Sequence, residues 1–467
     1  MANTACQTGE KEMAKKKPIT WPQWIGGFGG LLLLNELGMM AGWTSPYVAK
    51  LTEEGSPIPI TLKEASWVVS FFNFGRVFGG VMGSMSVNYL GSKTTILVTS
   101  VPMALCWVLT IVANHVFWLY GSRLLGGVSL GMTYSSFSLY IGEIANSKIR
   151  GALVALAMTG LTTGNLVMCS MGAYWRMETS GAVSLALCLI LMGLFVWLPE
   201  SPHHLVKKKL DEKARSSILW YHRDCDVEEE LQSLKKFVES FASQSFVGTL
   251  KEFKSPPIRK ALMITTMLFM YSQMCGINNV LFYMEMILRN SQVKVIEPAL
   301  VVVIVMVFGI AGSLFSMFLI EQLGRKILMA STIFTCAVSL VCLGTTFQLL
   351  HSGHDPSTFQ GLPIFSVIVF QVSVFAGILS VPSAVLGEIF PPHVKCVAAC
   401  IGSITAGVFA FISSISYQPM LDIIGEEYTF FAYAVINLTA IPFILFCVPE
   451  TKGKTLQEIQ DELLKKG

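Results

Sequence analysis

Residues 143–150 read Glu143-Ile-Ala-Asn-Ser-Lys-Ile-Arg150, and residues 388–395 read Glu388-Ile-Phe-Pro-Pro-His-Val-Lys395. In each octapeptide an acidic residue is followed seven positions later by a basic one. The first octapeptide follows the fourth long apolar run of the chain, and the second follows the tenth. Motifs that recur at matching places indicate an internal repeat. The two octapeptides therefore predict a chain built from two related halves.

Further motifs repeat in the same way at the ends of apolar runs. They follow the second and eighth runs and the sixth and twelfth: Asn88-Tyr-Leu-Gly91-Ser-Lys93, Glu321-Gln-Leu-Gly324-Arg325-Lys326, Pro199-Glu200-Ser201 and Pro449-Glu450-Thr451. All six motifs fall on one side of the predicted membrane. We interpret their charged residues as a gate, in which acids pair with bases across helix ends when this side closes. The alternative is simple loop packing with basic residues anchored at the membrane surface. The gating candidates are Glu143, Arg150, Glu200, Glu321, Arg325, Lys326, Glu388, Lys395 and Glu450.

The apolar runs identify the class of protein. Of the 467 residues, 53% are hydrophobic and only 13% are charged, whereas soluble proteins carry about 25% charged residues. This composition excludes disordered chains, nucleic-acid-binding proteins and ordinary cytosolic enzymes. A membrane-spanning helix needs about 20 apolar residues. Twelve such runs are present, at 24–47, 66–88, 94–114, 116–141, 151–173, 180–198, 261–288, 298–320, 327–350, 362–386, 397–418 and 428–448. We therefore predict an all-α polytopic membrane protein with twelve transmembrane helices in two six-helix repeats.

The basic residues predict the orientation of these spans. With the amino terminus in the cytoplasm, most of the 33 Lys and Arg residues lie on the cytoplasmic side of the membrane. The exceptions are Arg76 and Arg123 within spans, and Lys50, Lys63, Arg176, Arg289 and Lys294 outside. Because cytoplasmic loops are rich in Lys and Arg, we expect a multi-pass plasma-membrane protein with both termini in the cytoplasm. The expected domains are an N-tail (1–23), a first six-helix bundle (24–198), a cytoplasmic linker with short amphipathic helices (199–260), a second bundle (261–448) and a C-tail (449–467).

Several motifs occur together in a characteristic order. They are Gly121-Ser-Arg123, Tyr140-Ile-Gly-Glu143, Pro199-Glu200-Ser201-Pro202, Gln273-x-x-Gly276-Ile-Asn278, Glu321-x-x-Gly324-Arg325-Lys326, Glu388-Ile-Phe390 and Val448-Pro449-Glu450-Thr451. Over essentially the whole chain this set resembles the sugar porter family of the major facilitator superfamily. Thr44-Ser45-Pro46 and Glu64-Ala65-Ser66-Trp67 are similar to its insect facilitated trehalose transporter branch. The resemblance implies the major facilitator fold and facilitated sugar transport by alternating access. The repeat itself predicts a binding site between the halves.

Candidate sugar-binding side chains cluster in the seventh run. Gln273, Asn278 and Asn279 carry amides, which offer a donor and an acceptor together to sugar hydroxyls. The ring of Tyr283 can pack against the apolar face of a sugar. On a regular helix Gln273 and Asn278 lie about 140° apart, so they line one groove only if the helix is broken or wide-faced. Gly276 lies between them and permits a break. The alternative is hydrogen bonding between helices by buried amides.

Some positions depart from the family's pattern. Where the resemblance implies a Gln in the fifth span, an Asn in the eighth, a Trp in the tenth and an Asn in the eleventh, the chain has Met158, Gly309, Ser383 and Ala406. Each missing amide removes about 0.5–1.5 kcal/mol of net hydrogen bonding. A bulkier or less polar solute, a weakly held disaccharide and a protein that no longer transports therefore all stay open.

Among the charged residues inside predicted spans, three are notable: Glu36, Arg76 and Arg123. Ionisable groups in a membrane interior are costly and by default suggest function. At 1.5 Å per residue, Glu36 and Arg76 lie at similar depths, with Arg123 slightly further out. We expect Glu36 to pair with Arg76 or Arg123. If the pair persists it is structural, and if Glu36 takes up a proton during the cycle it couples transport to protons.

These observations leave three functions open. The first is facilitative transport of a sugar, trehalose or a hexose. The second is proton-coupled symport of a small organic solute through Glu36, and the third is a non-transporting sugar sensor with a lapsed site. We expect no enzymatic activity, no cofactor and no metal site, since no catalytic constellation is recognisable. The expected partners are a small solute and the lipid bilayer, without nucleic acid. The oligomeric state is unknown, and a monomer is assumed by default.

Overall fold

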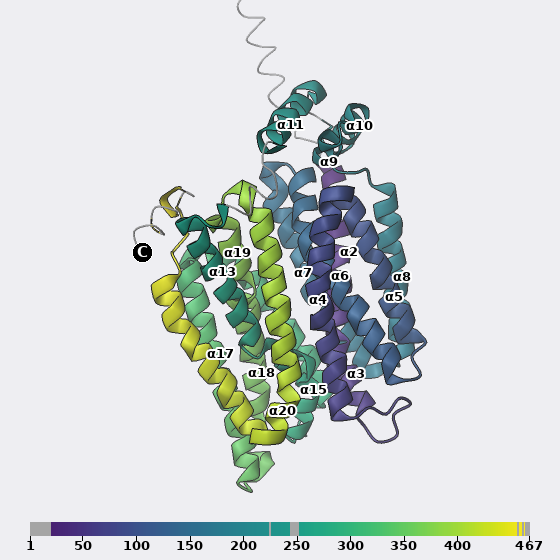
Figure 1. The fold of residues 1–467 in the computed structure, drawn as a ribbon. Coiled ribbons are helices and arrows are strands. Elements are labelled where there is room, and N and C mark those ends of the chain that lie inside the picture. Colours follow the sequence, from purple (N-terminus) through teal and green to yellow (C-terminus); the bar gives the residue numbers. More distant parts are fainter. Residues whose placement is uncertain (1–19, 224–225, 243–251, 455–456, 460–461, 463–467) are drawn as a thin grey trace, which may run out of the picture.

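A computed structural model describes residues 20–223, 226–242, 252–454, 457–459 and 462 (Figure 1). The predicted N-tail, 1–23, is described only from residue 20, and the predicted C-tail, 449–467, is described at 449–454, 457–459 and 462. In the described part of the chain the regular structure is helical, without strands. Twelve spans run through it, each within a few residues of its predicted run. The predicted all-α, twelve-helix fold is confirmed.

The first half contains six spans. Their helices are α2 (Trp21–Gly42) continued by α3 (Thr44–Leu51), α4 (Leu62–Leu90), α5 (Ser92–Ile111), α6 (Val116–Ile144), α7 (Ser147–Tyr174) and α8 (Met177–Trp197). The start of α4 illustrates how the sequence sets these bounds. The Thr61 side chain accepts from the Glu64 backbone N–H, and the Glu64 carboxylate accepts from the Thr61 backbone N–H. Such a reciprocal cap satisfies two otherwise unpaired donors.

The second half contains the other six spans. Its elements are α13 (Pro256–Met274), α14 (Ile277–Phe282), α15 (Met284–Asn290), α16 (Pro298–Leu323), α17 (Arg325–His351), the short η1 (Pro356–Thr358), α18 (Gly361–Ser373), η2 (Val374–Ile378), α19 (Ser380–Ile389) and α20 (Pro392–Cys447). The first three form one interrupted span. Another span combines α18, the π-helical η2 and α19. The long α20 holds two spans, which meet at a turn where Gly425 has φ 85°.

By length and apolarity alone, eight helical stretches among the described residues could cross a membrane. The stretch Val397–Cys447 counts once although it holds two spans. The other spans are α4, α6 and the interrupted α13–α15, which carry Arg76, Arg123 and the amides of the seventh run. In these three spans, charged or amide side chains interrupt the apolar composition.

Short helices define the two ends of the molecule. Figure 1 shows α9 (Pro202–Lys207), α10 (Asp211–Tyr221) and α11 (Val227–Ala242) together at one end, which we name the linker end. The opposite end, near α3 and α15, is named the far end. Linker helix α10 is fixed to the first half by Gln23, whose Nε2 donates to the Tyr221 carbonyl at 3.0 Å. The Tyr221 hydroxyl is fully buried against the hydroxyl of Tyr140 on α6.

Candidate functional site

The seventh span is broken inside the bundle. Helix α13 ends at Met274, Gly276 takes a left-handed conformation with φ 91°, and α14 starts at Ile277. Across this break the Asn278 Nδ2 donates to the Gln273 Oε1 at 3.3 Å. Both side chains are buried. The break that the sequence permits is present, and it brings together two amides that a regular helix would keep apart.

Polar groups of α20 support the break. The Asn437 Nδ2 donates to the Cys275 carbonyl at 3.2 Å and to the Tyr433 carbonyl at 2.9 Å. Asn279 donates to the Ser413 Oγ at 3.1 Å and to the Tyr433 hydroxyl at 2.7 Å. Asn279 thus makes the interhelical bonds of a structural amide. Asn437 was missed by the sequence analysis, where its only signal is an amide within an apolar run.

A second interruption occurs at Tyr283, between α14 and α15. Its ring packs on that of Tyr417, with centroids 4.9 Å apart. Its buried hydroxyl lies beside Ser66 of α4 without a well-formed hydrogen bond. The neighbouring Phe282 meets Phe72 of α4 edge to face at 6.2 Å. This part of the seventh span therefore contacts the first half.

The four departures from the family's pattern differ in environment. Met158 and Ser383 are exposed, whereas Gly309 and Ala406 are buried. The space beside Gly309 is filled by Gln371 of α18, because a Cβ on Gly309 would lie 3.1 Å from the Gln371 Cγ. The Gln371 amide is buried and donates to the Met306 sulfur at 3.5 Å. Gln371 is a second buried amide that the sequence analysis missed.

The structure corrects the expected ion pair of Glu36. This carboxylate is 1% exposed, and its Oε2 accepts from the indole N–H of Trp107 at 2.9 Å. Its Oε1 has no hydrogen-bond partner in the described part of the chain. Among the described residues, neither Arg76 nor Arg123 lies within ion-pair distance of it. Equal depth did not mean contact, because residues at one depth can face different sides of their helices.

Both intramembrane arginines are held by aromatic rings instead. The Arg123 guanidinium lies 4.1 Å from the ring centroid of Trp43 and donates to the Met40 carbonyl at 2.9 Å. The Arg76 guanidinium lies 5.0 Å from the ring of Tyr134. Cation–π contacts of this kind stabilise a desolvated cation by about 2 kcal/mol.

At the linker end, Glu200 caps the start of α5. Its carboxylate accepts from the backbone N–H groups of Lys93 at 3.1 Å and Thr94 at 3.0 Å. Free N–H groups and the helix dipole favour an anion at this position. Gly91 precedes the helix with φ 96°, and a Cβ there would lie 2.9 Å from the Glu200 Oε1. Glycine is thus required for the carboxylate to reach the helix.

The second half repeats this arrangement at α17. The Glu450 carboxylate accepts from the backbone N–H groups of Arg325 and Lys326, both at 3.1 Å. Gly324 has φ 81°, and a Cβ there would lie 2.7 Å from the Glu450 Oε2. Burial favours the protonated form of Glu450, but these N–H groups and that of Lys452 together hold its pKa below the ordinary value. The repeated motifs of the sequence therefore build the same cap twice.

The acids of the octapeptides are also bound within their own halves. Glu388 forms an ion pair with Arg325, with the Oε1 and Nη2 atoms 2.6 Å apart. In the first half, the Ser92 hydroxyl donates to the Glu143 carboxylate in the corresponding place. Arg325 and Glu388, both gating candidates, therefore pair across helix ends within the second half. Among the described residues, no ion pair joins gating candidates of the two halves. The first half replaces a charged pair with a neutral donor.

The remaining gating candidates take other partners. The Arg150 guanidinium donates to the Ala145 carbonyl at 3.4 Å, and the Lys395 ammonium donates to the Gly387 carbonyl at 2.7 Å. Within the described ranges, neither base is within ion-pair distance of the acid seven residues before it. Glu321 is exposed.

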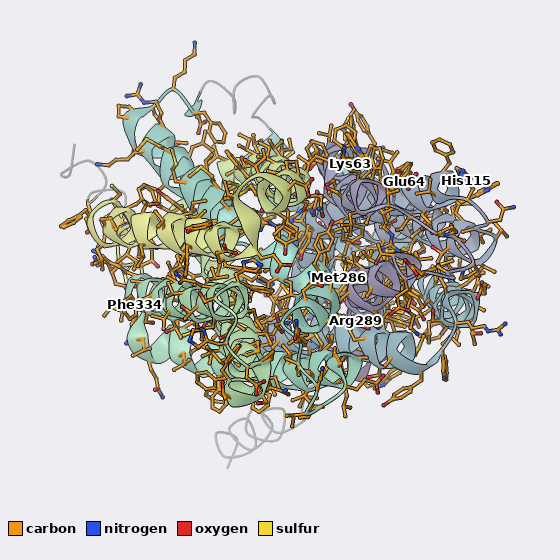
Figure 2. All side chains as sticks on the ribbon, turned by 90° about the horizontal axis from the view of Figure 1, so that it is seen from below. Lys63, Glu64, His115, Met286, Arg289 and Phe334 are labelled. Atoms are coloured by element: carbon orange, nitrogen blue, oxygen red, sulfur yellow. The ribbon has the colours of Figure 1, made fainter. Side chains whose placement is uncertain are left out.

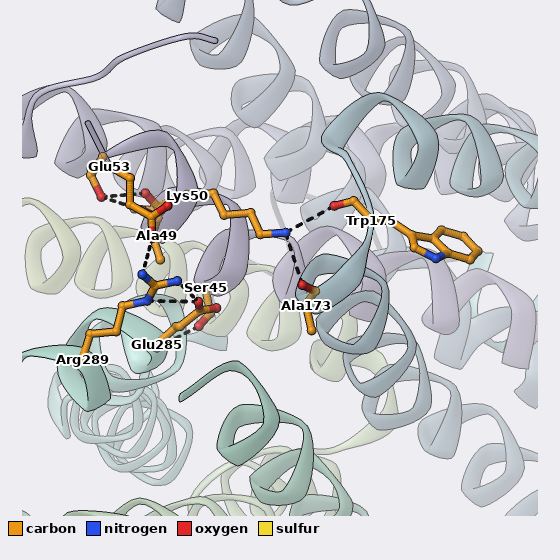
Figure 3. Close-up of polar contacts among 10 residues, drawn as sticks. Ser45, Ala49, Lys50, Glu53, Ala173, Trp175, Glu285 and Arg289 are labelled. Carbon is orange, nitrogen blue, oxygen red and sulfur yellow. Dashed lines mark hydrogen bonds and ion pairs between the residues drawn. The ribbon is translucent and has the colours of Figure 1, made fainter. Parts of the chain in front are cut away.

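Contacts between the halves appear at the far end, which Figure 2 views directly. Arg289 of α15 forms ion pairs with Glu285 on its own helix, at 2.7 Å, and with Glu53, which follows α3 (Figure 3). The backbone N–H of Glu285 donates to the Ser45 Oγ of α3 at 3.1 Å. Lys50 points away and donates to two carbonyls at the end of α7. The sequence analysis treated Arg289 only as an outer basic residue and missed this cluster.

The chemistry of these groups is that of reversible binding. The broken span offers amide donors and acceptors beside aromatic rings, which suit a polyhydroxylated solute. No group of three or more His, Cys, Asp or Glu residues in the described segments is arranged to hold a metal ion.

Solved structures of similar fold are known. The chain is similar to the inward-open xylose transporter XylE from E. coli, with 20% identity and a TM-score of 0.74. That match covers 94% of this chain and 98% of the other. It is also similar to the proton:xylose symporter XylE bound to a bromodeoxyglucose, with 19% identity, a TM-score of 0.73, and coverage of 95% and 98%. At these identities the likeness concerns the fold.

Sequence relatives cover nearly the whole chain. It is 30% identical over 433 residues to the facilitated trehalose transporter Tret1 of Polypedilum vanderplanki, covering 92% of this chain and 85% of that protein. It is 29% identical over 449 residues to Tret1 of Bombyx mori, covering 96% and 88%. The model of the family described as "Sugar (and other) transporter" matches residues 25–463. Because this match runs through both halves and both copies of the repeated motifs, the chain belongs to the sugar transporter family.

Proposed function

We propose that this protein carries a sugar, trehalose or a hexose, across the plasma membrane by facilitated alternating access. Family membership and the trehalose transporters among its relatives support sugar as the solute class. The observation that carries the proposal is the Gln273–Asn278 amide pair at the break of the seventh span. Interrupted helices in a bundle are common places for solute sites in transporters.

The distribution of contacts supports alternating access. At the far end, Arg289 and Glu285 of the second half are bonded to Glu53 and Ser45 of the first. At the linker end, the contacts of Glu143, Glu200, Glu388 and Glu450 described above stay within their own halves. We assign this conformation as closed at the far end. The Lys and Arg distribution supports a cytoplasmic linker end.

The direct test is uptake of labelled trehalose and glucose into proteoliposomes that contain the full chain. Gln273→Ala removes one member of the amide pair. Gln348→Ala, the matched control, removes an exposed amide on a different helix, α17. We expect saturable uptake that falls at least about fivefold in Gln273→Ala, since a lost buried hydrogen bond costs about 1–3 kcal/mol. The control is expected to keep it. Equal uptake by both variants would refute this location of the site.

A second candidate function is proton-coupled symport, and the environment of Glu36 favours it. An isolated carboxylate is costly inside a bilayer. Among the described residues, Glu36 has one Trp donor, an unpartnered Oε1 and no cation at ion-pair distance. Coupling predicts that an imposed pH gradient drives solute above its equilibrium level, and that Glu36→Gln abolishes this accumulation. Unchanged accumulation in Glu36→Gln would exclude Glu36 as the proton carrier.

A further inference from the structure

Arg289 at the far end is shared between two carboxylates of different character. Its Nη2 and Nε bond the Glu285 Oε1 at 2.7 Å and 3.2 Å, and its Nη1 bonds Glu53. The Glu285 side chain is 1% exposed, whereas that of Glu53 is 48% exposed. Glu285 lies one helical turn before Arg289, so this bond stays inside the second half. Of the described bonds of the Arg289 side chain, only that to Glu53 joins the two halves.

The buried Glu285 carboxylate can remain the ion-pair partner of Arg289 when the halves separate. The Glu285 Oε2 has no hydrogen-bond partner among the described residues. An Arg that loses Glu53 can therefore turn its second N–H toward this oxygen and form a bidentate pair. Opening the far end then breaks the exposed Arg289–Glu53 bond and the Ser45 bond to the Glu285 N–H, while the buried charge remains neutralised.

We propose that Arg289 is a partner-exchanging latch of the far end, bound to Glu53 and Glu285 when that end is closed and to Glu285 alone when it opens. The proposal rests on the alternating access proposed above, but it concerns which residues set the balance between the two states. Figure 3 shows the arrangement, with Arg289 pointing between Glu53 and Glu285.

The half-exposed position of the latch limits its strength. Exposed ion pairs shift an equilibrium by about twofold to fivefold and are screened by salt. A weak latch suits a transporter, because a strong one would hold the far end shut. Removal of the Glu53 charge should therefore shift the population toward the far-end-open state modestly and in a salt-dependent way.

The test measures access from the far-end side of the membrane. Ala49 of α3 lies within this cluster and is 2% exposed, so Ala49→Cys provides a reporter thiol in the full-length protein. Its rate of labelling by a membrane-impermeant maleimide is measured in membrane vesicles of both orientations, against the same chain without the reporter. We expect Glu53→Gln to raise the rate about twofold to fivefold at low salt, and Glu53→Lys to raise it further. At about 1 M NaCl the rate of the unsubstituted protein should rise toward that of Glu53→Gln, because salt screens the ion pair that the variant lacks.

Controls separate the latch from general effects. Glu54→Gln removes the same charge from the adjacent exposed residue and should leave labelling unchanged. Arg289 is left in place because its removal would strand the buried Glu285 carboxylate and endanger folding. Equal labelling of Glu53→Gln and Glu54→Gln would overturn the proposal. Because labelling needs no transported solute, a failure to transport sugar would leave this result interpretable and would count only against the proposed substrate.

Discussion

Glu200 and Glu450 place a carboxylate over the first N–H groups of a membrane helix, in each half of the molecule. The sequence motif predicts that these acids act at the linker end. It does not predict that their partners are backbone groups, because a motif names side chains but not the free N–H groups at a helix start. The glycines before these helices are the clue, since only glycine accepts both the positive φ and the close carboxylate.

Gly324→Ala tests this cap. The substitution forces φ near 81° on an Ala and places its Cβ 2.7 Å from the Glu450 Oε2. Such backbone strain costs about 1–3 kcal/mol. We expect a lower Tm of the purified protein, measured by fluorescence during heating. Gly361→Ala, where a Cβ meets open space, is the matched control, and equal Tm values would contradict the cap.

The lowered pKa of Glu450 predicts a pH dependence. A group whose pKa is lower in the folded state adds stability above its unfolded pKa, and this contribution is lost as the pH falls through the folded value. The Tm difference between the natural protein and Glu450→Gln should therefore be largest above pH 4.5, the ordinary pKa of a Glu side chain. It should shrink as the pH falls below that value. A difference that grows on acidification would show that the carboxylate does not act as the cap.

At the scale of elements, the interrupted α13–α15 span organises the candidate site. Its first break could be predicted, because Gly276 separates two amides that need a common face. Its second interruption, at Tyr283, could not, since a Tyr carries no signal for a helix end. The sequence also could not predict the bonds from Asn437 or the packing of Gln371 into the space beside Gly309. They depend on which helices become neighbours, and periodicity along one helix does not contain that information.

Asn437→Ala tests the support of the break. It removes donors to the carbonyls of Cys275 and Tyr433, so the amide pair loses its fixed geometry. We expect KM for the sugar to rise at least about fivefold, with a smaller change in maximal rate. Thr439→Ala, an exposed hydroxyl bonded within its own helix, is the control. A fall in maximal rate alone would indicate a folding defect rather than positioning.

At the scale of the whole molecule, twelve spans and their repeat follow from apolar runs and matching motifs. The arrangement of charges inside the membrane does not follow from them. Depth along a helix is fixed by residue number, but the direction in which a side chain points is fixed by packing. Glu36 consequently bonds Trp107 rather than an arginine. For the same reason the sequence could not predict the contact of Arg289 with Glu53, two residues that lie 236 positions apart.

The orientation of the molecule is open to a simple test. An epitope inserted after Gly353, in the exposed turn between α17 and α18, should be reached by antibody on intact cells. An epitope at residue 467 should be reached only after permeabilisation. This follows from the excess of Lys and Arg at the linker end, and the reverse pattern would invert the assignment.

The helix caps also impose an order in time. The N–H groups at the start of α5 are capped by Glu200, which is synthesised 107 residues later. Those at the start of α17 are capped by Glu450, 125 residues later. As the chain emerges from the ribosome, each half therefore receives its closing contact only when its last span has been made. A chain cut short before Glu450 would leave α17 with a bare end in the membrane. The cap in each half thus forms only after all six spans of that half have been synthesised.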